Sequence, residues 1–226
     1  MNDFVGVNIK IHLLLYVADV FSNRQLKWSV AWTHPFPLLP TPTLGKSTPG
    51  SKRRKSLTRF FFLFRFGGPA NVARTVTQYV RAGVAGLHIE DQVQTKRCGH
   101  LMGKQVVSRE EFLTRIRAAV IARDSIPGGS DFVIIGRTDS AQVLGMEEAV
   151  TRLKLAADAG ADVCFIEGVK TEELLRSTVA ALAPKPVLVN VISGGLTPSF
   201  TCAEAERMGA KIISTFISTT VCQLVP

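Results

Sequence analysis

Polar side chains follow four apolar segments in the second part of this 226-residue chain. Glu90 and Asp91 come after VAGLHI, residues 137–139 (RTD) after FVIIG, Glu167 after DVCFI and Asn190 after PVLV. In a parallel α/β fold the carboxyl ends of the strands share one face, and the loops on that face build the site. Acidic, basic and amide groups in these positions therefore favour one polar site over four unrelated strand ends in water.

The longest link of this region runs from Asp91 to Ser108, over 18 residues, whereas such links usually have about 2–6. It contains residues 96–100 (KRCGH). Two cations and an imidazole beside Cys98 favour the thiolate, which can exchange a proton near neutral pH. Gly99 lets a ligand approach the backbone closely. A surface loop with an incidental cysteine is the alternative that the spacing leaves open.

Alternating helix and strand patterns from residue 67 onward would position these side chains. Apolar residues at helical spacing predict helices over residues 69–82, 108–123, 146–159, 171–183 and 201–208. Short apolar runs predict strands over residues 84–89, 132–136, 162–166, 186–189 and 211–217. Ser108 and Glu111 have the spacing of a capping box. This alternation predicts a parallel sheet flanked by helices.

A weak repeat marks the passage from helix to strand three times: RAGVAGLHI, DAGADVCFI and RMGAKIIST. Its glycines, Gly83, Gly160 and Gly209, suit a left-handed helix stop. The pattern alone leaves both an α/β barrel and an open doubly wound sheet possible. No G-x-G-x-x-G sequence follows a strand, which counts against dinucleotide binding.

Residues 1–66 differ from the rest in composition. They hold ten of the 27 Lys and Arg but two of the 18 Asp and Glu, and eight of the 13 Phe. Prolines between residues 35 and 49 exclude a helix or central strand there. We expect residues 1–66 to be an irregular basic segment and residues 67–226 to be the globular domain. Because the domain is nearly neutral, the net charge of +9 does not indicate a nucleic-acid partner. No apolar run reaches the roughly 18 residues of a membrane span, so no membrane partner is expected.

Five segments, read in order, resemble the isocitrate lyase/phosphoenolpyruvate mutase superfamily: GGPANVARTV, GVAGLHIEDQ, KRCGHLMGK, IIGRTDS and FIEGVK. The members that look most alike are methylisocitrate and dimethylmalate lyases and fungal oxaloacetate hydrolases. The resemblance implies a Mg²⁺-dependent (β/α)₈ barrel, an enzyme that makes or breaks a C–C bond in small 2-oxo or 2-hydroxy dicarboxylates. The cation would stabilise the enolate-like anion that C–C cleavage leaves.

The resemblance also implies a role for each matching residue. Cys98 would be the proton donor, with assistance from Lys96, on a loop that closes over the substrate. Glu90 would belong to the shell of the metal. The residues that would bind the substrate are Gly99, His100, Arg137, Glu167 and Asn190.

The chain departs from the family pattern at both ends. The resemblance implies three βα units before residue 69, the last ending in Asp-x-Asp-Thr-Gly-Tyr/Phe-Gly with aspartates that hold Mg²⁺, and a helix after the last strand. Here Leu63-Phe64-Arg65 stands before Phe66-Gly67-Gly68. We therefore expect a partial TIM barrel of about five strands that binds Mg²⁺ poorly and is impaired as a lyase or hydrolase. We also expect residues 1–66 to be non-native coding sequence joined to a family fragment.

Other expectations concern partners and location. The alternative to an impaired enzyme is a non-catalytic remnant that binds a dicarboxylate or an intact paralogue. Family members form homo-oligomers, partly through the final helix, so we do not expect a firm oligomer here. The four cysteines lack the spacing of a zinc site or a disulfide framework and fit a reducing compartment. The expected location is cytoplasmic or mitochondrial, and the sequence does not decide between the two.

Overall fold

A computed structural model describes residues 11–18, 25–32, 60–61, 67–95, 97, 101–127, 131–192, 195 and 197–218. The strands are Ile11–Ala18 (β1), Gln25–Trp32 (β2), Phe60–Phe61 (β3), Gly86–Glu90 (β4), Val133–Thr138 (β5), Val163–Ile166 (β6), Val187–Ile192 (β7) and Ile212–Ser218 (β8). The helices are Pro69–Arg81 (α1), Arg109–Asp124 (α2), Met146–Asp158 (α3), Glu172–Leu182 (α4) and Cys202–Arg207 (α5), with a 3₁₀ turn at Ser140–Gln142 (η2). None of the helices in this described part is long and apolar enough to cross a membrane.

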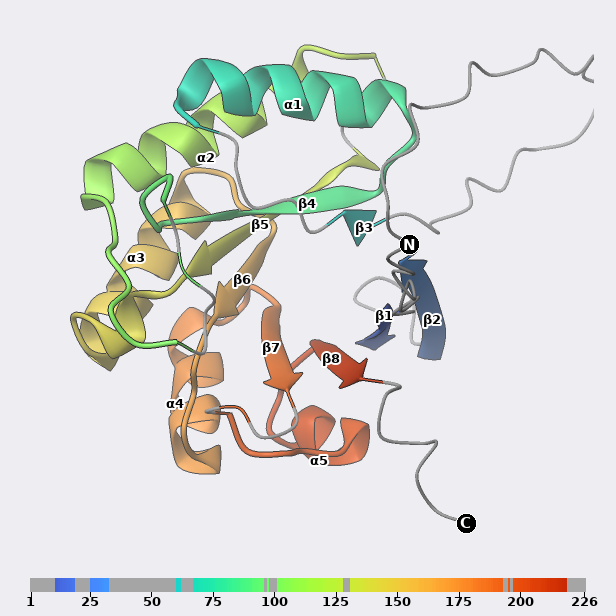
Figure 1. Ribbon diagram of the computed structural model, residues 1–226, viewed down its shortest axis with the longest axis vertical. Helices are drawn as coiled ribbons and strands as arrows, with labels where there is room; N and C mark the ends of the chain where they lie inside the picture. Colours follow the sequence, from blue (N-terminus) through green and yellow to red (C-terminus); the bar gives the residue numbers. More distant parts are fainter. Residues whose placement is uncertain are drawn as a thin grey trace, which may run out of the picture.

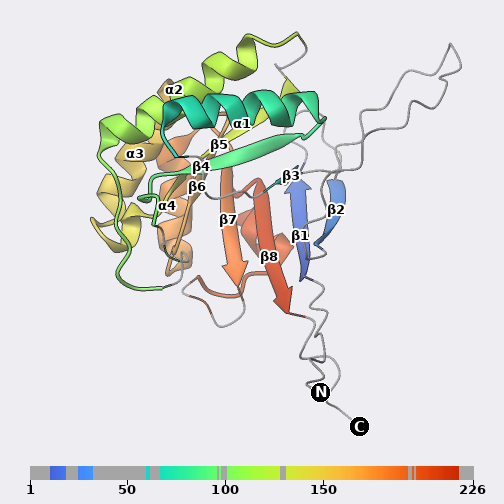
Figure 2. The ribbon, with the colours of Figure 1, turned by 45° about the horizontal axis from the view of Figure 1, so that its top comes forward.

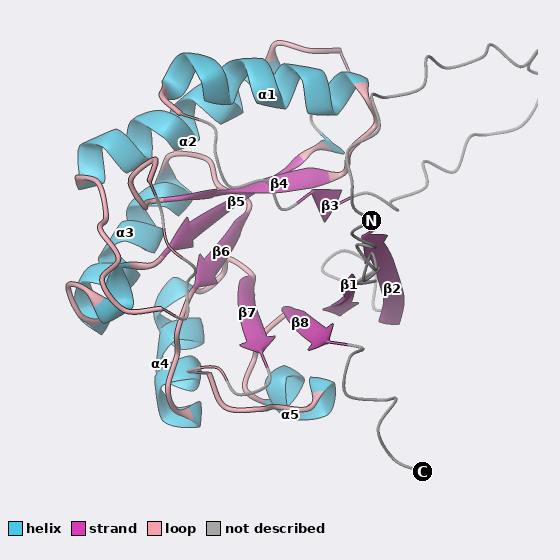
Figure 3. Cartoon of the chain, viewed as in Figure 1, coloured by secondary structure: helices cyan, strands magenta, loops and turns pink. Residues whose placement is uncertain are grey.

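Strands β4 to β8 run parallel and curve into part of a barrel, with the helices on its outer side (Figures 1 and 3). This confirms the α/β architecture and the partial barrel. Each predicted bound lies within two residues of the observed one, except that β7 continues three residues further, to Ile192; β5 also extends, to Thr138. Both extensions keep a strand partner, since Arg137 pairs with Glu90 and Asn190 with Ser214 in the strand register.

The passages from α1 to β4, from α3 to β6 and from α5 to β8 share one backbone conformation. Gly83, Gly160 and Gly209 have φ angles of 76°, 103° and 91°, which confirms the predicted left-handed helix stops. Two of these glycines also lack room for a side chain. An added Cβ would lie 2.9 Å from Cγ2 of Val120 at Gly160, and 2.8 Å from Cγ1 of Val179 at Gly209.

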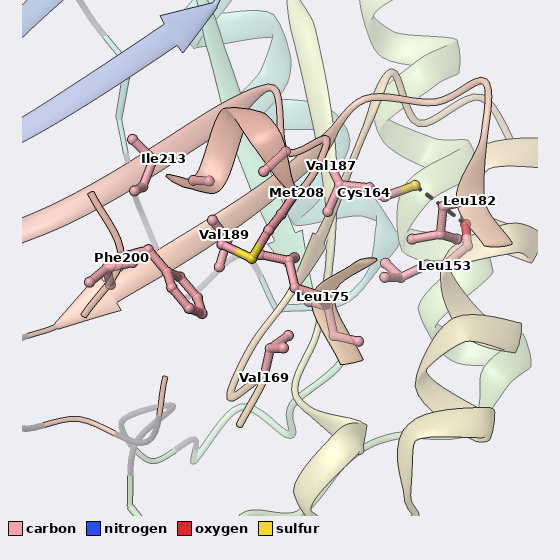
Figure 4. Close-up of a cluster of buried hydrophobic side chains, with 14 of the residues drawn as sticks. Leu153, Cys164, Val169, Leu175, Leu182, Val187, Val189, Phe200, Met208 and Ile213 are labelled. Carbon is pink, nitrogen blue, oxygen red and sulfur yellow. Dashed lines mark hydrogen bonds between the residues drawn. The ribbon is translucent and has the colours of Figure 1, made fainter. Parts of the chain in front are cut away.

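The helices pack on the outer face of the sheet through alternate residues of each strand. Figure 4 shows the core that α3, α4 and α5 form with β6, β7 and β8; its labelled members are Leu153, Cys164, Val169, Leu175, Leu182, Val187, Val189, Phe200, Met208 and Ile213. Cys164 is fully buried in this core, and its Sγ donates to the carbonyl of Leu153 at 3.8 Å. Burial raises the pKa of this thiol to about 11, so it stays protonated at neutral pH.

The opposite, inner face of these strands changes from apolar to polar along their length. A lower layer is apolar and no more than 5% exposed: Ile135, Val163, Phe165, Leu188 and Ile212. Because side chains alternate along a strand, positions two residues further on share this face. Those positions hold Arg137, Glu167, Asn190 and Ser214. Apart from His88 of β4, which lies in the lower layer, the chain therefore confines the polar groups of this face to the carboxyl ends of the strands.

Strands also occur within residues 1–66, which the sequence predicts to be irregular. β1 lies between β2 and β8 and is antiparallel to both, and Figure 2 shows it beside β8. β3 runs parallel to β4. The segment QLKWSVAW alternates large apolar residues with others, and IHLLLYVA is apolar apart from His12; both patterns are typical of strands. Proline and basic residues elsewhere in the segment hide this pattern. The prolines at 35–49 lie outside the described residues.

Candidate active site

Arg137 lies at the centre of a buried ionic cluster at the carboxyl end of the inner face. Its Nε and Nη2 donate to the two carboxylate oxygens of Asp139 at 2.9 and 3.2 Å. Its Nη2 also lies 2.9 Å from Oε2 of Glu167, and its Nε 3.4 Å from Oε2 of Glu90. Lys104 Nζ donates to Oδ1 of Asp139 at 3.1 Å. None of these five side chains is more than 6% exposed. We call these five residues the Arg137 cluster.

The apolar layer of the inner face supports this cluster from below. The guanidinium carbon of Arg137 lies 4.8 Å from the ring centre of Phe165, the distance of a cation–π contact. The same ring meets the imidazole of His88 edge-on, with 5.7 Å between ring centres. The orientation of the arginine fork is therefore fixed by an aromatic face as well as by carboxylates.

Mutual attraction favours the charged forms of Arg137 and Asp139 in spite of their burial. Burial lowers the pKa of Arg137, but Asp139, Glu167 and Glu90 outweigh it and raise the pKa above its ordinary value. Burial raises the pKa of Asp139, but Arg137 and Lys104 lower it to about 2. With all five groups ionised, three carboxylates share two cations.

Asn190 extends the cluster toward β8. Its Nδ2 donates to Oε2 of Glu167 at 3.4 Å, and its Oδ1 accepts from Oγ of Ser214 at 2.9 Å. Since a carboxylate only accepts hydrogen bonds, the amide must present its NH₂ group to Glu167. Ser214 supports this orientation because a hydroxyl can donate to the amide oxygen.

The long link between β4 and α2, residues 91–108, begins and ends beside the Arg137 cluster. Its two legs pair through Val93 N to Gln105 O at 3.1 Å and Val107 N to Asp91 O at 2.8 Å. The side-chain amide of Gln92 donates to the carbonyl of Arg97 and accepts from its N–H, both at 3.0 Å. The first leg is thereby tied to the backbone next to the predicted thiol.

The structure brings together four of the predicted site residues: Glu90, Arg137, Glu167 and Asn190. The other four lie outside the described residues: Lys96, Cys98, Gly99 and His100. All eight functional roles stay predictions.

Asp139, Lys104 and Ser214 also belong to the site, although the sequence assigned none of them a role there. Two of them carried a signal, because Asp139 ends the RTD run and Lys104 ends KRCGHLMGK. Ser214 carried none, since a serine within a strand is an ordinary residue.

The magnesium ion that the resemblance implies does not find a complete ligand set in this part of the chain. Among the described residues no group of three or more His, Cys, Asp and Glu side chains is placed to hold a metal ion. Glu90, the predicted metal-shell residue, directs one oxygen toward the guanidinium of Arg137. Magnesium requires oxygen ligands in nearly octahedral geometry. The described side chains therefore do not fit Mg²⁺ by themselves.

Comparison with known proteins relates this architecture to a group of enzymes. The sequence profile of phosphoenolpyruvate phosphomutases matches residues 65–223. The chain is 42% identical over 147 residues to 2,3-dimethylmalate lyase of Eubacterium barkeri, an alignment that covers 65% of this chain and 49% of the relative. It is 49% identical over 140 residues to 2-methylisocitrate lyase of Salmonella typhimurium, covering 62% and 46%. The chain thus spans about half the length of the curated relatives it matches.

Solved structures show the same similarity. A structure of oxaloacetate acetylhydrolase with the inhibitor 3,3-difluorooxalacetate matches with a TM-score of 0.63 and 54% identity, over 65% of this chain and 49% of that one. A structure of 2,3-dimethylmalate lyase matches with a TM-score of 0.64 and 55% identity, over 66% and 49%.

Proposed function

Since this chain belongs to the phosphoenolpyruvate phosphomutase family, we propose that it carries the substrate-binding side of a carbon–carbon lyase or hydrolase. Its substrates would be small 2-oxo or 2-hydroxy dicarboxylates of the methylisocitrate, dimethylmalate or oxaloacetate type, as the names of its relatives indicate. The observation that carries the proposal is the Arg137 cluster, in which a guanidinium fork, a lysine and an amide meet above an apolar layer.

The chemistry of the cluster suits the recognition of a carboxylate. The planar fork of arginine matches a carboxylate with two parallel hydrogen bonds. In this structure Asp139 and Glu167 take up such bonds from Arg137, so a substrate carboxylate would bind by exchanging with one of them. Asn190 and Lys104 would add N–H donors beside it. Small diacids are favoured because buried side chains enclose the fork closely.

The same donors would assist C–C cleavage. Breaking a bond next to the carbonyl or carboxylate leaves an enolate-like anion, and preorganised N–H groups stabilise such charge strongly where water is excluded. Cys98 is the predicted donor of the proton that the departing carbanion requires. A bound Mg²⁺ would supply additional stabilisation of the anion. The described residues do not fit that ion, so we assign no step to it and propose that turnover by this chain is impaired.

The experiment that tests this proposal uses the full chain. Isothermal titration with oxalate, with and without Mg²⁺, measures carboxylate binding, and parallel assays follow cleavage of 2-methylisocitrate, 2,3-dimethylmalate and oxaloacetate. We expect oxalate binding that Arg137→Met abolishes, together with slow or absent turnover. Arg123→Met is the matched control, because Arg123 pairs with Asp162 at the amino ends of the strands, whereas the Arg137 cluster lies at their carboxyl ends.

The results of this experiment distinguish the proposed impaired enzyme from a non-catalytic dicarboxylate binder. Absence of oxalate binding would contradict the proposed site. Binding that does not depend on Mg²⁺, with no turnover of any substrate, would favour the non-catalytic dicarboxylate binder. Turnover as fast as that of the full-length relatives would contradict the impairment.

A further inference from the structure

A second ionic chain runs from the surface of the molecule to the Arg137 cluster. Arg109, the first residue of α2, binds Glu148 of α3 through Nε at 2.8 Å and through Nη2. Glu148 accepts from Nε of Arg152, one helical turn further along α3, at 2.8 Å. Nη1 of Arg152 then donates to Oδ2 of Asp91 at 3.2 Å. Exposure falls along this chain, from 50% for the Arg109 side chain to 0% for Asp91.

Asp91 is where this chain reaches the site. Its Oδ1 accepts from the backbone N–H of Asp139 at 2.9 Å, and its Oδ2 from the hydroxyl of Thr138 at 2.6 Å. Its own N–H donates to the carbonyl of Arg137 at 3.2 Å. The carboxylate of Asp91 therefore fixes the short turn that directs Asp139 toward the guanidinium.

Arg152 joins this turn to the returning leg of the long link. Its Nη1 donates to Asp91 and also to the carbonyl of Val107 at 2.8 Å. Val107 lies three residues after Lys104, whose ammonium group donates to the side-chain carboxylate of Asp139. One buried nitrogen thus reaches both supports of Asp139, the turn after β5 and the leg that carries Lys104.

We propose that Arg152 is a positioning residue which, through Asp91 and Val107, holds Asp139 and Lys104 against Arg137. Net stability alone does not account for an arginine at this place, although its removal by itself would leave Asp91 and Glu148 without this partner. Buried ion pairs contribute little net stability, and apolar residues of similar volume often replace them without loss. The bridge between two site-bearing segments is a geometry that an apolar side chain cannot provide. The consequence for ligand binding rests on the proposed function, whereas the placement of Asp139 does not.

Arg123 provides a matched control for this role. It is a partly buried arginine whose Nη1 likewise donates to a carboxylate, Asp162 at 2.8 Å, and to a backbone carbonyl, Phe132 at 3.5 Å. Its side chain is 12% exposed, against 5% for Arg152. It lies at the amino ends of β5 and β6, away from the Arg137 cluster.

The test compares Arg152→Met and Arg123→Met in the full chain by amide hydrogen exchange and by titration with oxalate. We expect Arg152→Met to accelerate exchange of residues 104–107 and Asp139, and to weaken oxalate binding about tenfold. Arg123→Met should accelerate exchange near residues 132–134 and leave oxalate affinity unchanged. Adding guanidinium ion at non-denaturing concentration to Arg152→Ala should restore slow exchange and affinity, because the ion can occupy the vacated space.

The outcomes separate this proposal from the proposed function. Unchanged exchange at Asp139 and residues 104–107 in Arg152→Met would overturn the positioning role, and so would equal weakening of oxalate binding by Arg123→Met. If the unaltered chain does not bind oxalate, the proposed function fails while hydrogen exchange still decides the role of Arg152. If Arg152→Met does not fold, Arg152→Lys takes its place, since lysine keeps the charge but cannot reach Asp91, Val107 and Glu148 together.

Discussion

Arg137 is surrounded by more negative charge than it can neutralise alone. Glu90, Asp139 and Glu167 all approach its guanidinium, and Lys104 supplies the second cation. A cluster of this kind stabilises the fold only while it is complete, because each buried charge depends on the others. Binding and stability are therefore coupled at this residue.

Removing the charge of Arg137 is expected to destabilise the protein severely. Arg137→Met leaves three buried carboxylates with Lys104 as their nearby cation, and the expected loss is about 3–5 kcal/mol. Arg137→Lys keeps the charge but loses the fork, so we expect a smaller loss of stability together with weaker oxalate binding. Urea unfolding at pH 7 measures both free energies. A Met variant as stable as the unaltered chain would show that the carboxylates do not depend on Arg137.

The stability of the protein should fall at acid pH as Asp139 becomes protonated. The pKa of Asp139 is lowered from an ordinary 3.8 to about 2 in the folded protein. A lowered carboxyl pKa contributes stability above the ordinary value, and that contribution is lost as the pH falls toward the folded value. Asp139→Asn removes the titrating group and should be less stable than the unaltered chain at pH 6.

The control is the same comparison of the unaltered chain with Asp139→Asn at lower pH. The difference in unfolding free energy between the two proteins should shrink between pH 4 and pH 2, where Asp139 is losing its charge. Urea unfolding over this range measures it. A difference that stays constant from pH 6 to pH 2 would contradict the assigned cause.

At the scale of elements, the three glycine junctions set how each helix returns to the sheet. Gly83, Gly160 and Gly209 share the left-handed conformation, but their surroundings differ. Nothing lies within 4 Å of a Cβ added at Gly83, whereas Val120 and Val179 crowd the other two. Alanine at any of these positions is therefore strained, and at two of them it also collides with a valine.

A substitution series at these glycines separates the two effects. Gly83→Ala should cost about 1 kcal/mol through backbone strain alone. Gly160→Ala and Gly209→Ala should cost more, about 2–4 kcal/mol, because Val120 or Val179 must also move. Thermal or urea unfolding ranks the three variants. Equal losses at all three positions would mean that the packing at the valines adds nothing.

The sequence could predict the parallel half of the fold and part of the site because both follow local rules. The helix and strand periods and the glycine stops located α1 to α5 and β4 to β8. The rule that polar residues at parallel strand ends converge located Glu90, Arg137, Glu167 and Asn190. The pairing of Lys104 with Asp139 depends instead on the path of an 18-residue link, and no spacing rule predicts such a path. The roles of Lys96, Cys98, Gly99 and His100 stay predictions.

At the scale of the whole molecule, the sheet joins two parts of different character. β4 to β8 belong to the family half-barrel and run parallel, whereas β1 and β2 extend the sheet antiparallel from β8. We propose that residues 1–66 are a segment distinct in origin from residues 67–226, as their composition indicates. Sequencing of the transcript tests the origin of the segment, and mutation of β1 tests its contribution to stability.

A proline in β1 tests whether this segment stabilises the sheet. Leu14 pairs with Ser29 of β2 and with Thr215 of β8, so its N–H lies within a ladder on one side or the other. Leu14→Pro removes this donor and should cost about 3 kcal/mol. Leu14→Thr keeps the backbone N–H and is the control. If the proline variant unfolds at the same urea concentration as the unaltered chain, residues 11–18 do not contribute to the stability of the sheet.

The Arg137 cluster also has a consequence for evolution. Its five members come from four segments of the chain, and its three carboxylates gather around a single guanidinium, so none can be replaced without changing what the others tolerate. Across homologues, positions 90, 137, 139 and 167 should covary as a set. A lineage that has lost the arginine should also have lost at least two of the three acidic residues. The order of those losses would show how ligand binding is lost in such a barrel.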